Sequence, residues 1–506
     1  MNDGMKVLDK AQATEVSRHS RESGLTIGMC HGVFDLLHPG HFAHFQAAKK
    51  RVDVLFVSVT SDRYVNKGPG RPLFSDQVRA QTLSMLECVD FVFISDHETA
   101  IESIDTVKPH IYFKGSDYID ASNDLTGMIS KEVMQVQKYG GETVFTDEIT
   151  SSSTRLINTY FSIYGEEMEN WLRNFRSNFS FESVNSYLDL IEKTRVNVMG
   201  EVIIDKYTNC EPLAKSSKDP ILAFQIHNTE TFFGGVLAIR HNLLAWAHKV
   251  SLFSSLPKQV LMENMDLNQI IIEMEGLHTV KCENKLIIKH RFVDIVSKTR
   301  IFETYDFSQD ELGPLEGDFY QLISDHNSTA DVWIIADYGH GLISRELAKK
   351  ISSLDSFIAV NTQANAGNRG YNTITKYPRV DFLCLNGGEL QLELRDKNPN
   401  YMKIVPEYMK RLQSRYAILT LGAKGMMVFN RENFTLVPAL GRQIVDKVGA
   451  GDSVLAMGSL LARNGAPVEI MGLLCSIVAA HEISQLGHRT AMRLFDIRKA
   501  VKALLG

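Results

Sequence analysis

A short motif near the N-terminus, His38-Pro39-Gly40-His41, limits the fold most strongly, because it places two imidazoles between an apolar run and a helical pattern. Residues 25–30 are typical of a short buried strand, and residues 42–50 have helical spacing and end in lysines. A helix start offers unpaired backbone N–H groups and the positive end of the helix dipole, which both favour anionic phosphate. The two histidines are three positions apart and face one side of such a helix. The motif therefore predicts a phosphate site at a strand–helix junction.

The motif resembles the HxGH signature of cytidylyltransferase-like nucleotidyltransferases, and companion segments follow in that family's order. Residues 112–118 are similar to its KGxDY-type segment, and residues 151–155 to its SST-containing helix start. The resemblance implies a Rossmann-like nucleotidyltransferase domain over residues 1–160, in which His38 and His41 are catalytic and stabilise developing phosphate charge. The nucleotide- and phosphate-binding residues that it implies are Val33, Phe34, Lys50, Lys67, Arg79, Lys114, Gly115, Ser152, Ser153 and Thr154. The alternative, two structural histidines at a helix start, would suit a lone pair without these companions.

A second glycine-rich segment lies far downstream, where residues 446–452 read Asp-Lys-Val-Gly-Ala-Gly-Asp before an apolar helix of small residues. Gly449 and Gly451 would let backbone N–H groups converge on a transferring phosphoryl group. Asp452 is placed to take a proton from a hydroxyl group. A glycine-rich helix entry with a structural aspartate is the alternative, and it would leave the next set of motifs unexplained.

Those motifs resemble the ribokinase (PfkB) sugar kinases. Residues 386–389 are similar to the NxxE magnesium motif, residues 420–425 to the strand and turn that support ATP, and residues 200–205 to the start of that fold. The resemblance implies a ribokinase-like α/β sandwich over residues 194–506 with a small β lid, for which residues 284–300 are the candidate strands. It implies Asp452 as the catalytic base, Mg²⁺ held indirectly through Glu389, and a monovalent cation as a further candidate cofactor. The nucleotide-binding residues would be Asn386, Glu389, Thr420, Gly422, Gly425, Gly449, Ala450 and Gly451, and the sugar-binding residues Asp205, Gly234, Gly235 and Asn242.

Length and composition suit two such α/β domains. The chain has 506 residues, of which 44% are hydrophobic and 23% charged, enough for two or three cores. A net charge of −6 gives no reason to expect nucleic-acid binding, and no apolar run reaches the roughly 18 residues of a membrane span. Six scattered cysteines predict free thiols in a reducing compartment. We therefore expect a cytoplasmic enzyme acting on small molecules, with residues 161–193 as a helical linker and neither a nucleic-acid nor a membrane partner.

Together the halves resemble the bifunctional heptose kinase/adenylyltransferase (ADP-heptose synthase) family of lipopolysaccharide biosynthesis, with the domain order swapped. The resemblance implies phosphorylation of a heptose 7-phosphate-like sugar by ATP. It also implies nucleotidyl transfer from an NTP, with ATP favoured over CTP, to a sugar 1-phosphate, giving an ADP-heptose-like product and pyrophosphate. Kinases of this fold commonly dimerise through the lid, so a homodimer is expected.

Three departures from the kinase pattern leave two hypotheses open. Ala238 stands where an asparagine usually contacts the sugar, Lys447 stands where a threonine is common, and residues 361–363 lack an expected lysine. One hypothesis is a working kinase with altered specificity, which the presence of Asp452, Asn386 and Glu389 favours. The other is a polyol- or sugar-phosphate cytidylyltransferase whose degenerate kinase half serves as a binding or dimerisation module.

Overall fold

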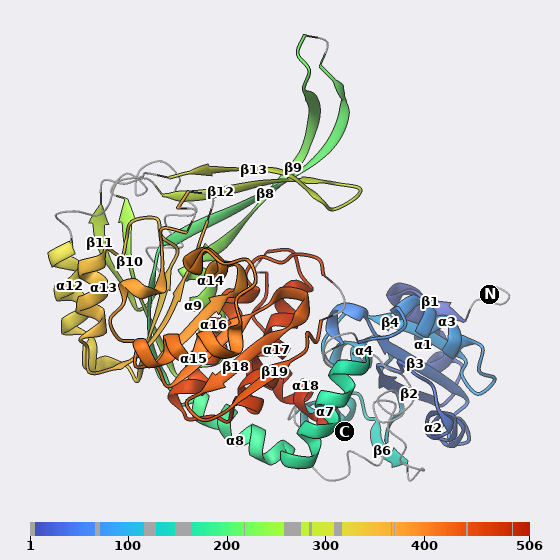
Figure 1. Cartoon of the computed structure of the whole chain (residues 1–506). Coiled ribbons are helices and arrows are strands. Elements are labelled where there is room, and N and C mark those ends of the chain that lie inside the picture. The colour runs from blue at the N-terminus through green and yellow to red at the C-terminus, as the bar shows by residue number, and fades with distance from the viewer. Residues whose placement is uncertain are drawn as a thin grey trace. The chain divides into compact units, whose positions relative to one another are not determined.

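The computed structural model divides into two compact units, Met1–Glu166 with Arg498–Gly506, and Glu167–Ile497 (Figure 1). The predicted domain boundaries at residues 160 and 193 stay predictions. The residues that the structure describes are 6–65, 71–115, 128–146, 164–216, 218–257, 275–282, 286–307, 316–365, 367–368, 370–441, 444–487 and 489–505.

The first unit is built on a six-stranded sheet in the order β1-β4-β3-β2-β5-β6, in which every neighbouring pair is parallel. Its strands are β1 (Val7–Leu8), β2 (Ile27–Gly32), β3 (Val54–Thr60), β4 (Phe91–Ser95), β5 (Ile111–Gly115) and β6 (Glu142–Thr146). Its helices are α1 (Lys10–Glu22), α2 (Pro39–Lys49), α3 (Asp76–Ser84), α4 (Ile101–Val107) and α5 (Ile129–Lys138).

Both faces of this sheet are covered, as parallel sheets require. Along β3, Leu55 and Val57 belong to a cluster with Phe45 of α2, whereas Val54 and Phe56 belong to a cluster with Ile104 of α4. Successive residues of β3 therefore enter opposite cores, which explains why the whole strand is apolar or small and buried. The result is the predicted Rossmann-like arrangement of three layers.

The second unit contains a nine-stranded sheet in the order β11-β10-β7-β14-β15-β16-β17-β18-β19. The run from β11 to β17 is parallel, and the last two pairs are antiparallel. The strands are β7 (Arg195–Gly200), β10 (Lys249–Pro257), β11 (Leu277–Cys282), β14 (Val332–Asp337), β15 (Phe357–Thr362), β16 (Phe382–Asn386), β17 (Tyr416–Thr420), β18 (Met426–Asn430) and β19 (Phe434–Val437).

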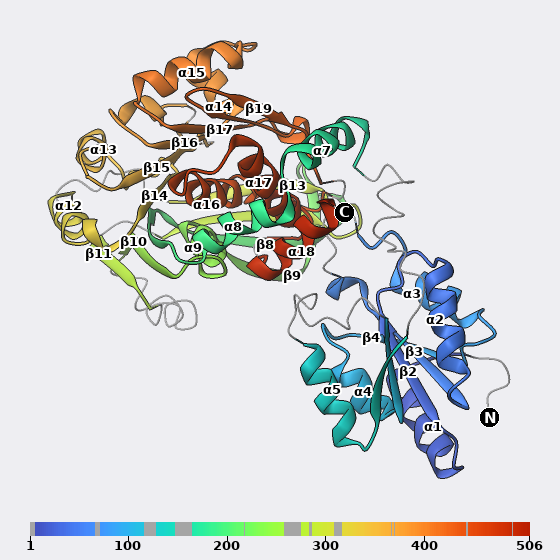
Figure 2. The ribbon, with the colours of Figure 1, turned by 90° about the horizontal axis from the view of Figure 1, so that it is seen from below.

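Helices cover both faces of this sheet as well (Figure 2). One face carries α12 (Glu316–Asp325), α13 (Arg345–Ser352), α14 (Gly387–Leu394) and α15 (Tyr401–Arg411), and the other carries α8 (Phe181–Ile191), α9 (Val236–Leu244), α16 (Ala450–Arg463) and α17 (Val468–Ile483). Two further helices, α7 (Glu166–Asn178) and α18 (Leu494–Leu505), span the bounds of the two units, because Glu166 and Arg498–Gly506 group with the first unit. The predicted α/β fold class is confirmed.

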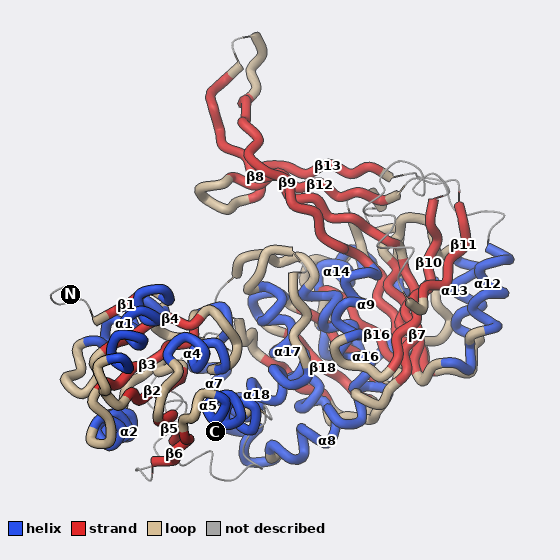
Figure 3. The backbone as a smooth tube through the Cα atoms, turned by 180° about the vertical axis from the view of Figure 1, so that it is seen from behind, coloured by secondary structure: helices blue, strands red, loops and turns tan. Residues whose placement is uncertain are grey.

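A separate four-stranded sheet forms the lid, in the order β13-β12-β8-β9 (Figure 3). Its strands are β8 (Val202–Lys215), β9 (Leu222–Gly235), β12 (Ile287–Asp294) and β13 (Arg300–Asp306). The sequence predicted only the pair at residues 284–300. The structure adds the long β8–β9 hairpin, whose far end extends away from the nine-stranded sheet.

Predicted linker residues form α7 and α8. On α7, the indole N–H of Trp171 donates a hydrogen bond to the hydroxyl of Thr435 on β19, over 3.3 Å. In the described part of the chain, no helix combines the length and the apolar character that crossing a bilayer would need.

Candidate active sites

The two motif histidines lie together at the start of α2. His38 is the N-cap residue, Pro39 takes the first helical position, where its missing N–H costs nothing, and the His38 side chain is buried. The rings of His38 and His41 stack with centroids 3.8 Å apart. Phe34 meets His41 edge to face at 5.4 Å. The structure thus brings three of the predicted residues to one helix N-terminus, which suits a phosphate group.

The loop before these histidines has an unusual backbone that its neighbours hold in place. Phe34 has φ +50°, a left-handed conformation that non-glycine residues rarely adopt, and a Cβ atom on Gly32 would lie 3.0 Å from the Phe34 ring. Asp35 accepts hydrogen bonds from the backbone N–H groups of Leu73 and Phe74 and forms a buried ion pair of 2.7 Å with Arg71. A side chain at position 32 would therefore crowd the Phe34 ring, which would have to shift by a few tenths of an ångström.

Arg79 also contacts this loop and its neighbours. Its buried guanidinium donates hydrogen bonds to the carbonyl groups of Val33, Thr60 and Phe74 and forms an ion pair of 2.6 Å with Asp62. These contacts favour a positioning role for Arg79 over the predicted contact with nucleotide phosphate.

Lys114 and Gly115 end β5, the strand beside β2, so they lie at the sheet edge where the histidine loop begins. Lys114 forms an ion pair of 2.8 Å with the buried carboxylate of Glu132. Burial, together with the charge of Lys114, lowers the pKa of His44 to about 4 and that of His31 to about 3. This edge is therefore a largely buried environment in which the neighbouring imidazoles stay neutral.

One predicted residue lies elsewhere. Lys50 is the C-cap residue of α2, and the 11-residue helix spans about 16 Å, so Lys50 is at the end away from His38. The structure does not bring Lys50 to the histidines, because residues at opposite helix ends cannot share one phosphate. Lys67, Ser152, Ser153 and Thr154 lie outside the described residues.

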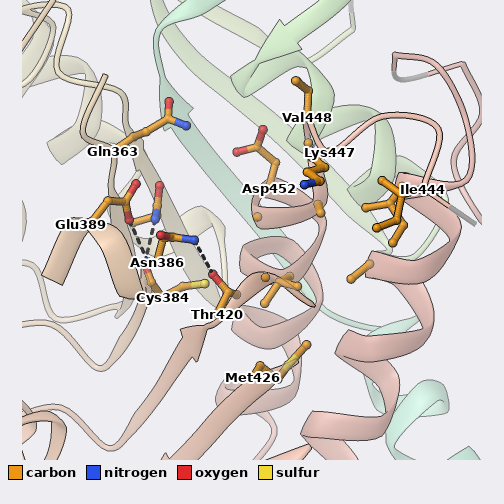
Figure 4. Close-up of a pocket in the computed structure, with 18 of the residues that line it drawn as sticks. Gln363, Cys384, Asn386, Glu389, Thr420, Met426, Ile444, Lys447, Val448 and Asp452 are labelled. Atoms are coloured by element: carbon orange, nitrogen blue, oxygen red, sulfur yellow. Dashed lines mark hydrogen bonds between the residues drawn. The ribbon is translucent and has the colours of Figure 1, made fainter. Parts of the chain in front are cut away.

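In the second unit, a cavity of about 680 Å³ opens beside the glycine segment (Figure 4). Gly449 is the N-cap residue of α16 with φ +85°, and Asp452 lies in the first turn of that helix. Asn386 and Thr420 line one side of the cavity, and Lys447 and Asp452 lie across from them. Most of the predicted kinase residues line it: Asp205, Gly235, Asn386, Glu389, Thr420, Gly422, Gly425, Gly449, Ala450, Gly451 and Asp452.

Asn386 and Glu389 form a capping box at the start of α14. The Glu389 carboxylate accepts a hydrogen bond from the backbone N–H of Asn386 over 2.8 Å, and the Asn386 amide donates to the Thr420 hydroxyl over 3.3 Å. Burial raises the pKa of Glu389 to about 7, and the nearby Asp452 carboxylate adds to this. Within the described ranges, no cluster of three or more histidine, cysteine or carboxylate side chains is arranged to hold a metal ion directly. The resemblance implied an indirect Mg²⁺ contact through Glu389, and the side-chain oxygens of Asn386 and Glu389 are donors that suit such a contact.

Lid strands supply the upper wall of the cavity. On β12, Arg291 pairs with Asp205 of β8 over 2.5 Å, and Lys289 lies below 10% exposure with its ammonium 5.9 Å from the Tyr338 ring. Burial lowers the pKa of Lys289, whereas the charge of Asp205 opposes that change. A Cβ atom on Gly234 would lie 2.3 Å from Asp205, so this glycine makes room for the carboxylate but does not line the cavity.

One predicted sugar contact lies outside the cavity lining. Asn242, predicted to bind sugar, is buried on α9 and donates a hydrogen bond to the Ser453 hydroxyl over 3.0 Å, so it joins α9 to α16 outside the cavity lining. Ala238 is buried on the same helix. Lys447, by contrast, lines the cavity.

Sequence reasoning missed the lid residues Lys289, Arg291 and Arg300 and the tyrosine Tyr338, which all line the cavity. A signal for the first two was present. Positions 287, 289, 291 and 293 form the buried face of β12, and a lysine and an arginine on an otherwise apolar face indicate a polar site beneath it.

Two family models match separate segments of this chain. Residues 29–159 match the cytidylyltransferase-like family, and residues 359–493 match the pfkB family of carbohydrate kinases. Each half of the chain thus contains a segment that matches a known family. The histidine site falls in the cytidylyltransferase-like segment, and Asn386, Thr420 and Asp452 fall in the pfkB segment.

Curated relatives match over the N-terminal domain. The bifunctional protein HldE of Syntrophotalea carbinolica is 36% identical over 151 residues, 29% of this chain and 29% of the relative. The bifunctional protein HldE of Geobacter metallireducens is 38% identical over 147 residues, 28% of this chain and 29% of the relative. The chain therefore spans less than a third of the length of these relatives.

A solved structure supports the fold of the pfkB half. The tetrameric inhibited form of phosphofructokinase-2 from Escherichia coli superposes with a TM-score of 0.50 at 14% identity, covering 62% of this chain and 99% of that chain. At this identity the likeness concerns the fold alone.

Proposed function

We propose that the chain is a bifunctional enzyme of nucleotide-sugar biosynthesis. Its pfkB half phosphorylates a heptose 7-phosphate-like sugar with ATP, and its cytidylyltransferase-like half transfers a nucleotidyl group from an NTP to a sugar 1-phosphate. The observation that carries this proposal is the presence, on one chain, of a histidine pair at a helix N-terminus and a carboxylate at a glycine-rich helix start, each inside its matching family segment.

In the transferase half, the sugar 1-phosphate attacks the α-phosphorus of the NTP, and pyrophosphate leaves. The attacking phosphate is ionised at neutral pH, so the reaction needs no strong base. His38, His41 and the start of α2 act by positioning the triphosphate and stabilising the charge that moves onto the leaving group. The resemblance to the HldE proteins favours ATP as the nucleotide.

In the kinase half, the acceptor is a hydroxyl group, which must lose a proton as it attacks the γ-phosphorus. Asp452 takes that proton, while the backbone N–H groups at the start of α16 stabilise the transferring phosphoryl oxygens. Magnesium would be held through water by Glu389 and Asn386, where it would neutralise triphosphate charge. Asp205, which pairs with Arg291, would contact the sugar hydroxyls.

The cavity supports a working kinase over a degenerate binding module. Asp452, Glu389 and the glycine segment line one cavity of about 680 Å³, which is large enough for a nucleotide and a sugar phosphate. Lys447 adds a cation to that wall. In the described part of the chain it has no acidic partner, so its charge is available to a triphosphate.

We also propose that the enzyme is a cytoplasmic homodimer that joins through the lid. Four large apolar side chains of the β8–β9 hairpin are at least 60% exposed: Leu213, Ile221, Leu222 and Ile226. Such exposure on a hairpin is typical of a protein interface. The six cysteines are unpaired and mostly buried, which fits a reducing compartment.

The proposal is tested by following two products from the purified full chain. Pyrophosphate release is measured with each NTP and a panel of sugar 1-phosphates, and ADP release with heptose 7-phosphate and related sugars. We expect His41→Ala to lower pyrophosphate release about a hundredfold or more and to spare ADP release. Asp452→Asn should abolish ADP release and spare pyrophosphate release. Near-normal pyrophosphate release from His41→Ala would refute the transferase site, and wild-type protein that phosphorylates no sugar would favour the binding-module hypothesis.

A further inference from the structure

Tyr338 makes a contact that neither the sequence motifs nor the proposed reaction assigns. Its phenol O–H donates a hydrogen bond to Oδ1 of Asp452 over 2.8 Å. The two residues come from different elements, because Tyr338 directly follows β14 and Asp452 lies in the first turn of α16. Tyr338 is only 2% exposed, yet its hydroxyl reaches a carboxylate that lines the cavity.

The backbone of Tyr338 is fixed on both sides. Its N–H donates to the buried carboxylate of Glu201 over 3.1 Å, and its carbonyl accepts from the Asn365 amide over 2.6 Å. Glu201 also accepts from the N–H of His340 over 3.0 Å, so one carboxylate holds two points of the loop. Because the Tyr338 backbone is fixed in this way and its side chain is buried, the phenol is a donor at a fixed position. The hydrogen bond to this donor therefore favours one orientation of the Asp452 carboxylate.

The environment keeps the phenol in its donating form. Burial raises the pKa of Tyr338 well above its ordinary value, and the adjacent Asp452 carboxylate adds to this. Tyr338 therefore remains protonated at neutral pH, when an ionised Asp452 needs a donor.

We propose that Tyr338 is a positioning residue for the kinase reaction, which holds the Asp452 carboxylate in the orientation that takes the proton of the acceptor hydroxyl. This inference rests on the proposed kinase function. In the step itself, the acceptor O–H bond breaks, its proton passes to Asp452, the oxygen bonds to the γ-phosphorus, and ADP leaves. Tyr338 keeps its own proton throughout.

A second tyrosine provides a matched control. Tyr377 is wholly buried and donates its hydroxyl hydrogen to Oδ2 of Asp337 over 2.7 Å, so it has the same pairing of tyrosine with aspartate in the same unit. Neither Tyr377 nor Asp337 lines the cavity. Tyr377→Phe and Tyr338→Phe each remove one buried hydroxyl and its bond, and only the second removes a bond to the proposed base.

The experiment measures kcat for sugar phosphorylation, the Kd of ATP and the melting temperature for the full-length wild type and for four variants. The variants are Tyr338→Phe, Tyr377→Phe, Asp452→Asn and the double variant Tyr338→Phe/Asp452→Asn. We expect Tyr338→Phe to lower kcat about tenfold and to leave the Kd of ATP within about twofold. Both Tyr338→Phe and Tyr377→Phe should lower the melting temperature, by similar amounts. Only Tyr377→Phe should leave kcat unchanged. In the Asp452→Asn background, Tyr338→Phe should cause no further loss of the residual rate, because the two residues act as one unit.

The outcomes separate the two claims. If the wild type is active, a normal kcat in Tyr338→Phe would refute the positioning role alone. The same holds if Tyr338→Phe lowers the rate as much in the Asp452→Asn background as in the wild type. A kcat loss of the same size in Tyr377→Phe would also refute it, because stability would then explain the result. A wild type without phosphoryl transfer to any sugar would refute the kinase function and this inference together.

Discussion

Tyr207 of the lid strand β8 donates its hydroxyl hydrogen to Oδ2 of Asp446 over 2.6 Å, which ties the lid to the loop before the glycine segment. The other carboxylate oxygen of Asp446 accepts from the backbone N–H of Val448 over 3.0 Å and pairs with Arg300 of β13. One buried aspartate thus joins two lid strands to the proposed phosphate cradle.

Asp446→Ala should therefore weaken the kinase half in two ways. The buried Tyr207 hydroxyl would lose its acceptor, whereas the Arg300 side chain is 41% exposed and can be hydrated. We therefore expect the free energy of unfolding of the second unit to fall by roughly 2 kcal/mol. Phosphorylation should fall at least tenfold, and nucleotidyl transfer should be unchanged. Thermal unfolding and the two product assays measure these effects. Glu230→Gln is the control, because its pair with Arg489 is largely exposed and should contribute less than about 1 kcal/mol. Equal effects of the two variants would contradict the proposed link.

The role of Arg79 can be separated from phosphate binding. Arg79→Lys keeps a positive charge but cannot reach three carbonyl groups and Asp62 at once. We expect the first unit to melt at a lower temperature and pyrophosphate release to fall through kcat, while the exposed Arg63→Lys changes neither. A rise in the KM of the NTP without a loss of melting temperature would instead support the predicted phosphate contact.

Lys447 should contribute to triphosphate binding in the kinase half. Lys447→Met removes a cation from the cavity wall beside Gly449, so we expect the KM of ATP to rise about tenfold, with a smaller effect on the KM of the sugar. Steady-state ADP release measures both constants. Lys410→Met removes an exposed lysine from α15, outside the cavity, and should leave them unchanged. An unaltered KM of ATP in Lys447→Met would assign the lysine no role in nucleotide binding.

His44 predicts a pH dependence of stability in the first unit. Its pKa is lowered to about 4 in the folded protein, so between pH 4 and its ordinary value of 6.5 the unfolded chain binds the proton more readily. The free energy of unfolding therefore has no penalty from His44 above pH 6.5 and falls as the pH drops toward 4. At pH 5 this loss is about 2 kcal/mol. Urea unfolding at pH 7 and pH 5 should show a smaller difference for His44→Gln than for wild type. His19→Gln, on the exposed face of α1, should keep the wild-type difference, and an NMR titration of His44 near pH 6.5 would contradict the prediction.

The sequence predicted elements whose side chains carry a pattern and missed those whose burial uses small or polar groups. The start of α2 was predictable, because Pro39 and the histidine pair identify a helix N-terminus. The first helix, α1, went unpredicted, because its buried positions are Ala13, Ser17 and Ser20, which give no apolar periodicity.

Similar limits apply to the kinase site. The β8–β9 hairpin was missed, because the outer parts of both strands are exposed on both faces and show no alternation. Asn242 was misplaced, because nearly all of α9 is buried and the sequence therefore does not show which face meets the cavity. The contact between Tyr338 and Asp452 joins residues 114 positions apart, which no local pattern can reveal.

The loop that Arg79 and Asp35 hold around Phe34 has a thermodynamic consequence. Its shape is fixed by contacts made during folding, so a nucleotide that docks there restricts few additional bonds and little conformational entropy opposes binding. The heat-capacity change on binding at this loop should then reflect the surface that the ligand itself buries, without the larger value that accompanies the folding of a segment. A nucleotide should accordingly raise the melting temperature of the first unit only as mass action requires, in proportion to the logarithm of its concentration.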